Sequence, residues 1–103
     1  MKKDFFVYIL TNHDETTFYI GVTSNLLGRM WEHKNKINNG FSSKYNLCKL
    51  VYFEVGDSSS SAIAREKQLK RWHRQWKLNL IKEFNPEFND LSAGWIDPEM
   101  NSG

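Results

Sequence analysis

The sequence predicts one α/β domain of the α+β type, in which a small, three-stranded, mainly antiparallel sheet is flanked by helices. Two β-favouring runs stand close together near the N-terminus, a third occupies residues 49–55, and residues 62–84 form a helical stretch without Pro or Gly. A chain of 103 residues with 40% hydrophobic and 25% charged residues can build one hydrophobic core. We expect the order β-β-α-β-α(-α), with residues 1–91 as the domain and residues 92–103 as an acidic C-terminal tail.

The first two runs, residues 5–10 and 17–22, are predicted to form a β-hairpin closed by the polar, turn-forming segment 11–16. If the loop is symmetric, residues whose numbers sum to 27 face each other, which places Tyr8 opposite Tyr19. A slip of one residue would separate the two phenols, because side chains alternate between the faces of a sheet.

A helix is predicted next, at residues 26–36, and both Ser24 and Asn25 are candidate N-caps. Residues 38–47 are predicted to be a loop that leads into the third strand at 49–55.

The serines at 58–61 can cap the helical region 62–84, which Asn85-Pro86 ends. This region forms either one helix or two helices with a bend near residues 72–74. Its apolar stripe, including both tryptophans, is expected to face the core. The stripe consists of Ala62, Leu69, Trp72, Trp76, Leu80 and Phe84.

Charge is unevenly distributed along the chain. All 14 Lys and Arg residues lie within residues 1–82 beside 7 of the 12 acidic residues, whereas residues 83–103 carry the other 5 acids and no base. A basic body suits a polyanion such as nucleic acid, although a solvated helical surface gives the same composition. Cys48 is the only cysteine, so the chain has no internal disulfide and no Cys-based zinc site. This cysteine usage fits a reducing compartment, so we expect a cytoplasmic protein. No apolar run reaches transmembrane length, and we expect no membrane partner.

Several residues carry candidate chemistry. Gly21 would leave space on the tyrosine face for a ligand backbone to approach. Arg29 and His33 are four residues apart and share a helical face, where an arginine can grip a phosphate and a histidine can move protons. Taken alone, the tyrosines, the arginine and the histidine are also what an ordinary sheet and helix surface contain.

Glu66 is the more informative of the charged residues. Its helical neighbours include Ile63 and Leu69, and an unpaired carboxylate on an apolar face is costly. It therefore needs a cation, which is either a metal ion or Lys70 at i+4. Further basic and aromatic residues suit a phosphate backbone. The candidate nucleic-acid-binding residues are Gly21, Lys44, Tyr45, Lys70, Arg71 and Arg74.

The order of these elements resembles the GIY-YIG nuclease superfamily. VYIL is followed by YIGVT, then by R-x-x-x-H in the next helix, and then by LVYFE and a helix that carries ARE-x-x-LK before Asn85-Pro86. More narrowly, the chain is similar over residues 4–91 to the small stand-alone proteins of that superfamily, the UPF0213 group, which resemble the N-terminal nuclease domain found in excinuclease. The first motif departs from the pattern, with Phe6-Val7-Tyr8 in place of Gly-Ile-Tyr.

The resemblance implies a metal-dependent endonuclease that hydrolyses phosphodiester bonds, with DNA as the first candidate substrate. It implies that Tyr8, Tyr19, Arg29 and His33 are catalytic and that Glu66 binds Mg²⁺ or another divalent cation such as Mn²⁺. We expect one tyrosine, with Tyr8 as our first choice, to activate water and the other to position it. Many members carry a later asparagine near the site. The candidates for it here are Asn79 and Asn85.

Three other functions remain open on the sequence alone. The same fold could be a nucleic-acid-binding module with little intrinsic cleavage, or a DNA repair or processing factor that depends on a protein partner for specificity. A third interpretation is a protein-interaction domain that uses the acidic tail.

Overall fold

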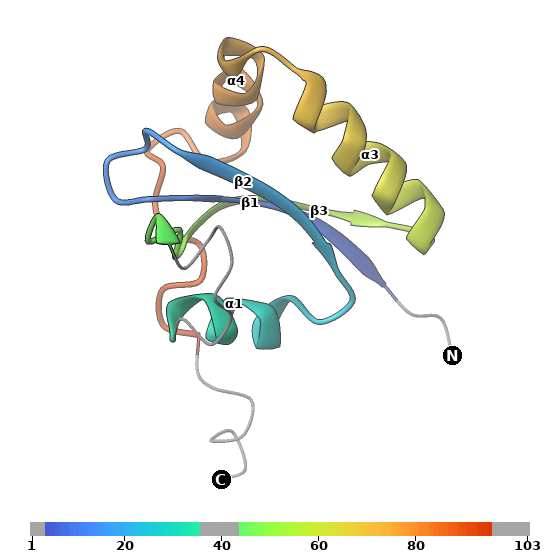
Figure 1. Ribbon diagram of the computed structural model, residues 1–103, viewed down its shortest axis with the longest axis horizontal. Coiled ribbons are helices and arrows are strands. Elements are labelled where there is room, and N and C mark those ends of the chain that lie inside the picture. The colour runs from blue at the N-terminus through green and yellow to red at the C-terminus, as the bar shows by residue number, and fades with distance from the viewer. Residues whose placement is uncertain (1–3, 36–43, 96–103) are drawn as a thin grey trace, which may run out of the picture.

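A computed structural model describes residues 4–35 and 44–95 of the chain. Within these residues the chain folds into a three-stranded antiparallel sheet and three helices, which confirms the predicted fold class and element order. Helix α1 covers one face of the sheet, and α3 and α4 cover the other (Figure 1). Two separate hydrophobic clusters fill these two interfaces.

The sheet is built around its first strand. Strand β1 (Phe5–Thr11) lies between β2 (Phe18–Thr23) and β3 (Lys49–Gly56), so the strand order is β2-β1-β3. Because β1 has a neighbour on both sides and a helical layer on both faces, its residues 7–11 are all buried. Burial on both faces explains why the sequence of β1 is a continuous apolar run.

The hairpin register differs from the predicted one. Tyr8 pairs with Gly21 and Leu10 pairs with Tyr19, so facing residues sum to 29. The reason lies in the loop, where the Asn12 side chain accepts hydrogen bonds from the backbone N–H groups of residues 16 and 17 at 2.9 and 3.1 Å. The loop therefore closes between Thr11 and Phe18, one residue further along β1 and one residue later at the start of β2 than the symmetric loop predicts.

The three helices begin where capping side chains can satisfy their first N–H groups, with one exception. Asn25, and not Ser24, caps α1 (Leu26–Lys34), and Ser58 forms a capping box at the start of α3 (Ser59–Arg71). Helix α4 (Arg74–Phe84) starts without a side-chain cap. None of the helices in the described part of the chain is long and apolar enough to span a membrane.

The predicted bend near residues 72–74 is a complete break. Trp72 and His73 both have extended backbone, with ψ angles of 147° and 153°, so α4 starts in a new rotational phase. Its buried side is marked by Ile81. Trp76 and Phe84 are 54% and 48% exposed, and the expectation that the whole stripe faces the core is wrong for them. A single helical period cannot be carried across two extended residues.

A bulge joins the sheet to the segment after α4. Ile9 pairs with Tyr52 and Leu10 pairs with Leu50, which leaves Val51 as an extra residue in β3. The Val51 carbonyl oxygen accepts a hydrogen bond from Asn85 Nδ2 at 3.1 Å. The bulge thus gives the end of α4 a fixed place against the central part of β3.

Candidate active site

The candidate active site lies on the face of the sheet that α1 covers. Tyr8 of β1 and Tyr19 of β2 are diagonal neighbours on this face, with ring centroids 6.2 Å apart. Although the predicted pairing is wrong, the register differs by an even number of residues, so the side chains keep their face and the phenols still meet. Tyr8 is 1% exposed, whereas Tyr19 is only partly buried.

Gly21 stands directly opposite Tyr8 and provides the room for its ring. A Cβ atom built on Gly21 would lie 2.6 Å from Tyr8 Oη and 2.7 Å from Tyr8 Cζ. The space that we expected a ligand backbone to enter is therefore taken by the Tyr8 phenol.

His33 in the last turn of α1 joins the two tyrosines. Its ring centroid is 5.9 Å from that of Tyr8 and 5.8 Å from that of Tyr19. The Nε2 atom is 3.3 Å from Tyr8 Oη in a buried hydrogen bond. His33 is itself buried, so one helical side chain and two strand side chains form a compact cluster.

The protonation states in this cluster follow from burial. Burial raises the pKa of the Tyr8 phenol, and the neighbouring Tyr19 raises it further, so Tyr8 keeps its proton at neutral pH. Burial lowers the pKa of His33, and the Arg29 guanidinium lowers it further. His33 is therefore a neutral imidazole at pH 7, and with Nε2 unprotonated it accepts the hydrogen bond that the Tyr8 hydroxyl donates.

Arg29 lies one turn before His33 on α1, as the spacing predicts. Its Nε is 3.4 Å from Glu32 Oε1, and both side chains are 40% exposed. Glu32 also raises the pKa values of Tyr8 and His33, so it is an acidic member of this region that the sequence reasoning missed. The spacing of three residues between Arg29 and Glu32 could have predicted this ion pair, because residues at that spacing are neighbours on a helix surface.

Glu66 belongs to α3, the helix that together with α4 covers the face of the sheet opposite to α1 (Figure 1). Its Oε2 is 3.4 Å from Lys70 Nζ. Of the two cations predicted as partners of this carboxylate, a metal ion or Lys70, the structure shows Lys70. Ile63, one of its apolar neighbours, is 44% exposed, which shows that Glu66 sits at the rim of the core. The structure therefore brings Tyr8, Tyr19, His33 and Arg29 together, and Glu66 comes from a helix that covers the opposite face of the sheet.

Glu66 is nevertheless suited to a weakly coordinated divalent ion. Its side chain keeps 19% exposure, and one carboxylate is a sufficient protein ligand for Mg²⁺, which retains several waters and binds substrate phosphate. In the described ranges no group of three or more His, Cys, Asp and Glu side chains is placed to hold a metal ion. The residues therefore fit an ion that takes one ligand from Glu66 and the others from water and substrate. They do not fit an ion held by protein ligands alone.

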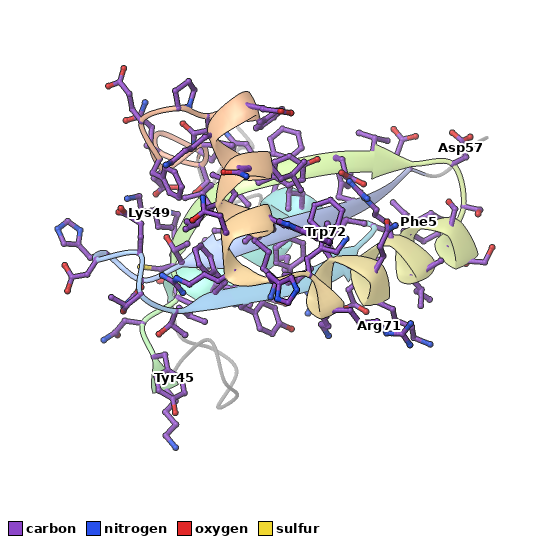
Figure 2. All side chains as sticks on the ribbon, turned by 90° about the horizontal axis from the view of Figure 1, so that it is seen from above. Phe5, Tyr45, Lys49, Asp57, Arg71 and Trp72 are labelled. Atoms are coloured by element: carbon purple, nitrogen blue, oxygen red, sulfur yellow. The ribbon has the colours of Figure 1, made fainter. Side chains whose placement is uncertain are left out.

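The predicted nucleic-acid-binding residues have different surroundings. The Arg74 guanidinium lies 4.7 Å from the centroid of the Phe18 ring and donates to the carbonyl oxygens of Glu15 and Thr16, so it anchors the hairpin loop. In contrast, Arg71 points outward from α3 (Figure 2).

The remaining predicted contacts are in the segment before β3. Tyr45 projects away from the body of the domain in Figure 2, with Lys44 Nζ 5.5 Å from the centroid of its ring. Both side chains are exposed. Residues 36–43, which include most of the predicted loop, lie outside the described residues.

The two candidates for the later asparagine have other bonding partners. Asn85 is buried and is bonded to Val51 and to the backbone of Asn89, which makes it a structural residue. Asn79 is exposed on α4 and accepts a hydrogen bond from Gln75. The partners of both side chains in these hydrogen bonds are therefore residues outside the tyrosine cluster.

The match of a family model over residues 4–79 shows that the chain belongs to the GIY-YIG catalytic domain family, a family of nucleases. Members of this family generally use divalent metals and bind nucleic acid. The resemblance inferred from the sequence is thereby confirmed.

Within that family the chain is similar to UPF0213 proteins. It is 41% identical over 88 residues to the one from Syntrophus aciditrophicus, which covers 84% of this chain and 98% of the relative. The relative from Haloquadratum walsbyi is 35% identical over 87 residues, covering 81% of this chain and 92% of its own. A solution NMR structure of the Bacillus halodurans UPF0213 protein has a TM-score of 0.54 at 22% identity and covers 90% of this chain and 99% of that one, which supports the fold.

Proposed function

We propose that this chain is an endonuclease that hydrolyses phosphodiester bonds in nucleic acid, with DNA as the first substrate to test. The observation that carries the proposal is the cluster of Tyr8, Tyr19 and His33 beside Arg29, which combines a proton acceptor with a phosphate-binding cation. Family membership supports the reaction class.

In the proposed reaction the partly buried Tyr19 contacts the attacking water, and Tyr8 relays its proton. This reverses the roles that we assigned first, because Tyr8 is too deeply buried to meet solvent. Tyr8 is hydrogen-bonded to both Tyr19 and His33. As water attacks phosphorus, its proton passes to Tyr19 Oη, the Tyr19 proton passes to Tyr8 Oη, and the Tyr8 proton passes to His33 Nε2. No free phenolate is formed, so the raised pKa of Tyr8 does not prevent the relay.

Arg29 has two effects in this scheme. It stabilises the negative charge that develops on the phosphate, an electrostatic contribution of the kind whose loss costs about 100-fold or more in rate. A bound phosphate would also offset the positive charge of Arg29 that lowers the pKa of His33. Substrate binding thus makes His33 a better proton acceptor than it is in the free protein.

Glu66 would hold one divalent ion together with water and a substrate oxygen. The chemistry that Mg²⁺ supplies when bound is neutralisation of charge on the phosphate and the leaving oxygen. For Glu66 to accept this role, its ion pair with Lys70 must open, which a surface pair worth about 0.2–0.5 kcal/mol permits.

The test is a cleavage assay on single-stranded, double-stranded and branched DNA and on RNA, with Mg²⁺, with Mn²⁺ and with chelator. Tyr19→Phe, Arg29→Ala and Glu66→Ala should each lose metal-dependent cleavage by about 100-fold or more. Glu87→Ala, which removes an exposed carboxylate outside the site, should cleave like the wild type. No metal-dependent cleavage by the wild type, or equal cleavage by all variants, would contradict the proposal.

A second candidate function is a nucleic-acid-binding module that cleaves poorly or only with a protein partner. The ion pair of Glu66 with Lys70 favours it, because this pair must open before the carboxylate can bind a metal ion. Binding that persists in chelator and weakens steeply with salt, without cleavage of any substrate, would establish this alternative.

A further inference from the structure

A row of large side chains begins at Trp72, in the link between α3 and α4, and continues along α4. Its first two rings have centroids 5.9 Å apart, and Trp72 and Leu80 are partly buried against the core. We use the name α4 stripe for Trp72, Trp76, Leu80 and Phe84, which follow one another at intervals of four residues. Trp76 and Phe84 are among the most exposed large hydrophobic side chains in the described chain. Large apolar side chains that line up on a surface indicate a binding site more often than singly scattered ones do.

The stripe borders two adjoining hollows. One, of about 350 Å³, is lined by Trp72, Trp76, Asn79, Leu80 and Glu83. The other, of about 270 Å³, is lined by Tyr52, Leu80, Glu83 and Phe84. Because Leu80 and Glu83 line both, the hollows form one row along the helix. Each combines flat or apolar walls with a polar side chain that can bond the edge of a planar group.

Trp76 is the most accessible ring of the row. The guanidinium of Arg65 lies 5.2 Å from the centroid of the Trp72 ring, and Glu54 holds that guanidinium through a 2.8 Å ion pair. Trp76 meets neighbouring rings edge-on, with interplanar angles of 84° to Trp72 and 88° to His73. Trp76 thus offers indole surface to an incoming planar ligand.

The charge around the stripe selects the kind of ligand. Residues 59–84 carry seven basic side chains and two acidic ones. Lys77 follows Trp76 directly, and Arg71 points outward just before Trp72 (Figure 2). An apolar protein partner needs no such excess of positive charge, whereas a polyanion with flat, stackable groups matches both features.

We propose that the α4 stripe binds the unpaired bases of single-stranded nucleic acid, with Trp76 as the principal stacking surface and Lys77 and Arg71 as phosphate contacts. A duplex hides its base faces by stacking them on one another, so only an unpaired strand can use the indole. The inference rests on the proposed function in taking nucleic acid as the ligand, but binding is measurable in chelator without cleavage. Failure of the stripe to bind single strands can therefore be told apart from failure of the nuclease proposal.

The experiment measures anisotropy of fluorescein-labelled 12-nucleotide probes in chelator: oligothymidylate, oligouridylate, an abasic strand with the same phosphates, and a duplex. Trp76→Ala should weaken binding of the two base-bearing single strands by about 5- to 100-fold and leave the abasic strand and the duplex unchanged. Trp76→Phe should restore most of the affinity, because a phenyl ring still stacks. The matched control is Trp95→Ala, which removes a tryptophan that is 39% exposed on the α1 side of the domain and should change nothing.

Lys77→Gln should act differently and lower the slope of log affinity against log salt by somewhat less than one, for all four probes. The proposal is overturned if Trp76→Ala binds oligothymidylate within two-fold of the Trp95→Ala control. It is equally overturned if the abasic strand loses as much affinity as the base-bearing strands. Sedimentation of the wild type as a dimer that Trp76→Ala dissociates would assign the stripe to a second copy of the chain instead.

Discussion

Replacing Gly21 with alanine tests whether the tyrosine cluster depends on an empty position in β2. The new Cβ would lie 2.6 Å from Tyr8 Oη, whereas ordinary contact begins near 3.4 Å, so the phenol must move by about 0.8 Å, the difference between the two. Tyr19 Cε2 would be 3.0 Å away, so the new Cβ is also too close to the second tyrosine. Tyr8 is 1% exposed, so its neighbours must move with it.

Overfilling a packed site in this way costs about 1–3 kcal/mol of the free energy of unfolding. For a domain of this size each kcal/mol lowers Tm by about 4–8 °C. The Tyr8 hydroxyl is already 3.3 Å from His33 Nε2, so a displacement of this size breaks or misaligns the hydrogen bond. We therefore expect cleavage by folded Gly21→Ala protein to fall further than the loss of stability explains.

The assay is thermal unfolding followed by circular dichroism, with cleavage measured at 25 °C, where the variant is still folded. Gly56→Ala is the matched control, because its Cβ would meet its nearest neighbour at 3.4 Å and should shift stability by no more than about 0.5 kcal/mol. Adding Tyr8→Phe to Gly21→Ala removes the closest atom and should recover part of the lost stability. If Gly21→Ala and Gly56→Ala unfold at the same temperature and cleave equally well, the argument is wrong.

Two further predictions concern buried polar groups. The lowered pKa of His33 means that its contribution to stability is present above the unfolded value of about 6.5 and is lost as pH falls through the lower folded value. Urea unfolding should therefore show a larger loss between pH 7.5 and 5 for the wild type than for His33→Gln, and parallel losses would refute the assignment. Asn85→Ala removes the donor to the Val51 carbonyl oxygen and should lower stability by about 1–3 kcal/mol with an unchanged m value. The exposed Asn79→Ala is its control, and equal urea midpoints for the two variants would show that the buried amide is dispensable.

The sequence predicted the elements and their faces better than their exact pairing. Alternation along β1 and β2 was enough to put Tyr8 and Tyr19 on one face. The register was not predictable from symmetry, because Asn12 binds two backbone N–H groups across the loop and sets where the strands begin to pair. Such a contact depends on loop conformation, which apolar periodicity does not report.

In the helical region, too, the apolar pattern predicted the elements but not their exact geometry. Apolar spacing identified a helix and a bend, but it could not reveal that two extended residues, Trp72 and His73, start α4 in a new phase. Trp76 was therefore assigned to the core and is in fact exposed. The i+4 partner of Glu66 was foreseen, whereas the face of the sheet that α3 covers was not. That choice is made by tertiary packing.

The contacts that hold the hairpin loop also set an order of events during synthesis. Both tyrosines precede Arg74 in the chain. Arg74 donates to the carbonyl oxygens of Thr16 and Glu15, which lie 58 and 59 residues before it. Asp90, which accepts from the Leu50 N–H and pairs with Lys34, comes later still. A nascent chain therefore contains Tyr8 and Tyr19 before it contains the arginine that anchors the loop between their strands.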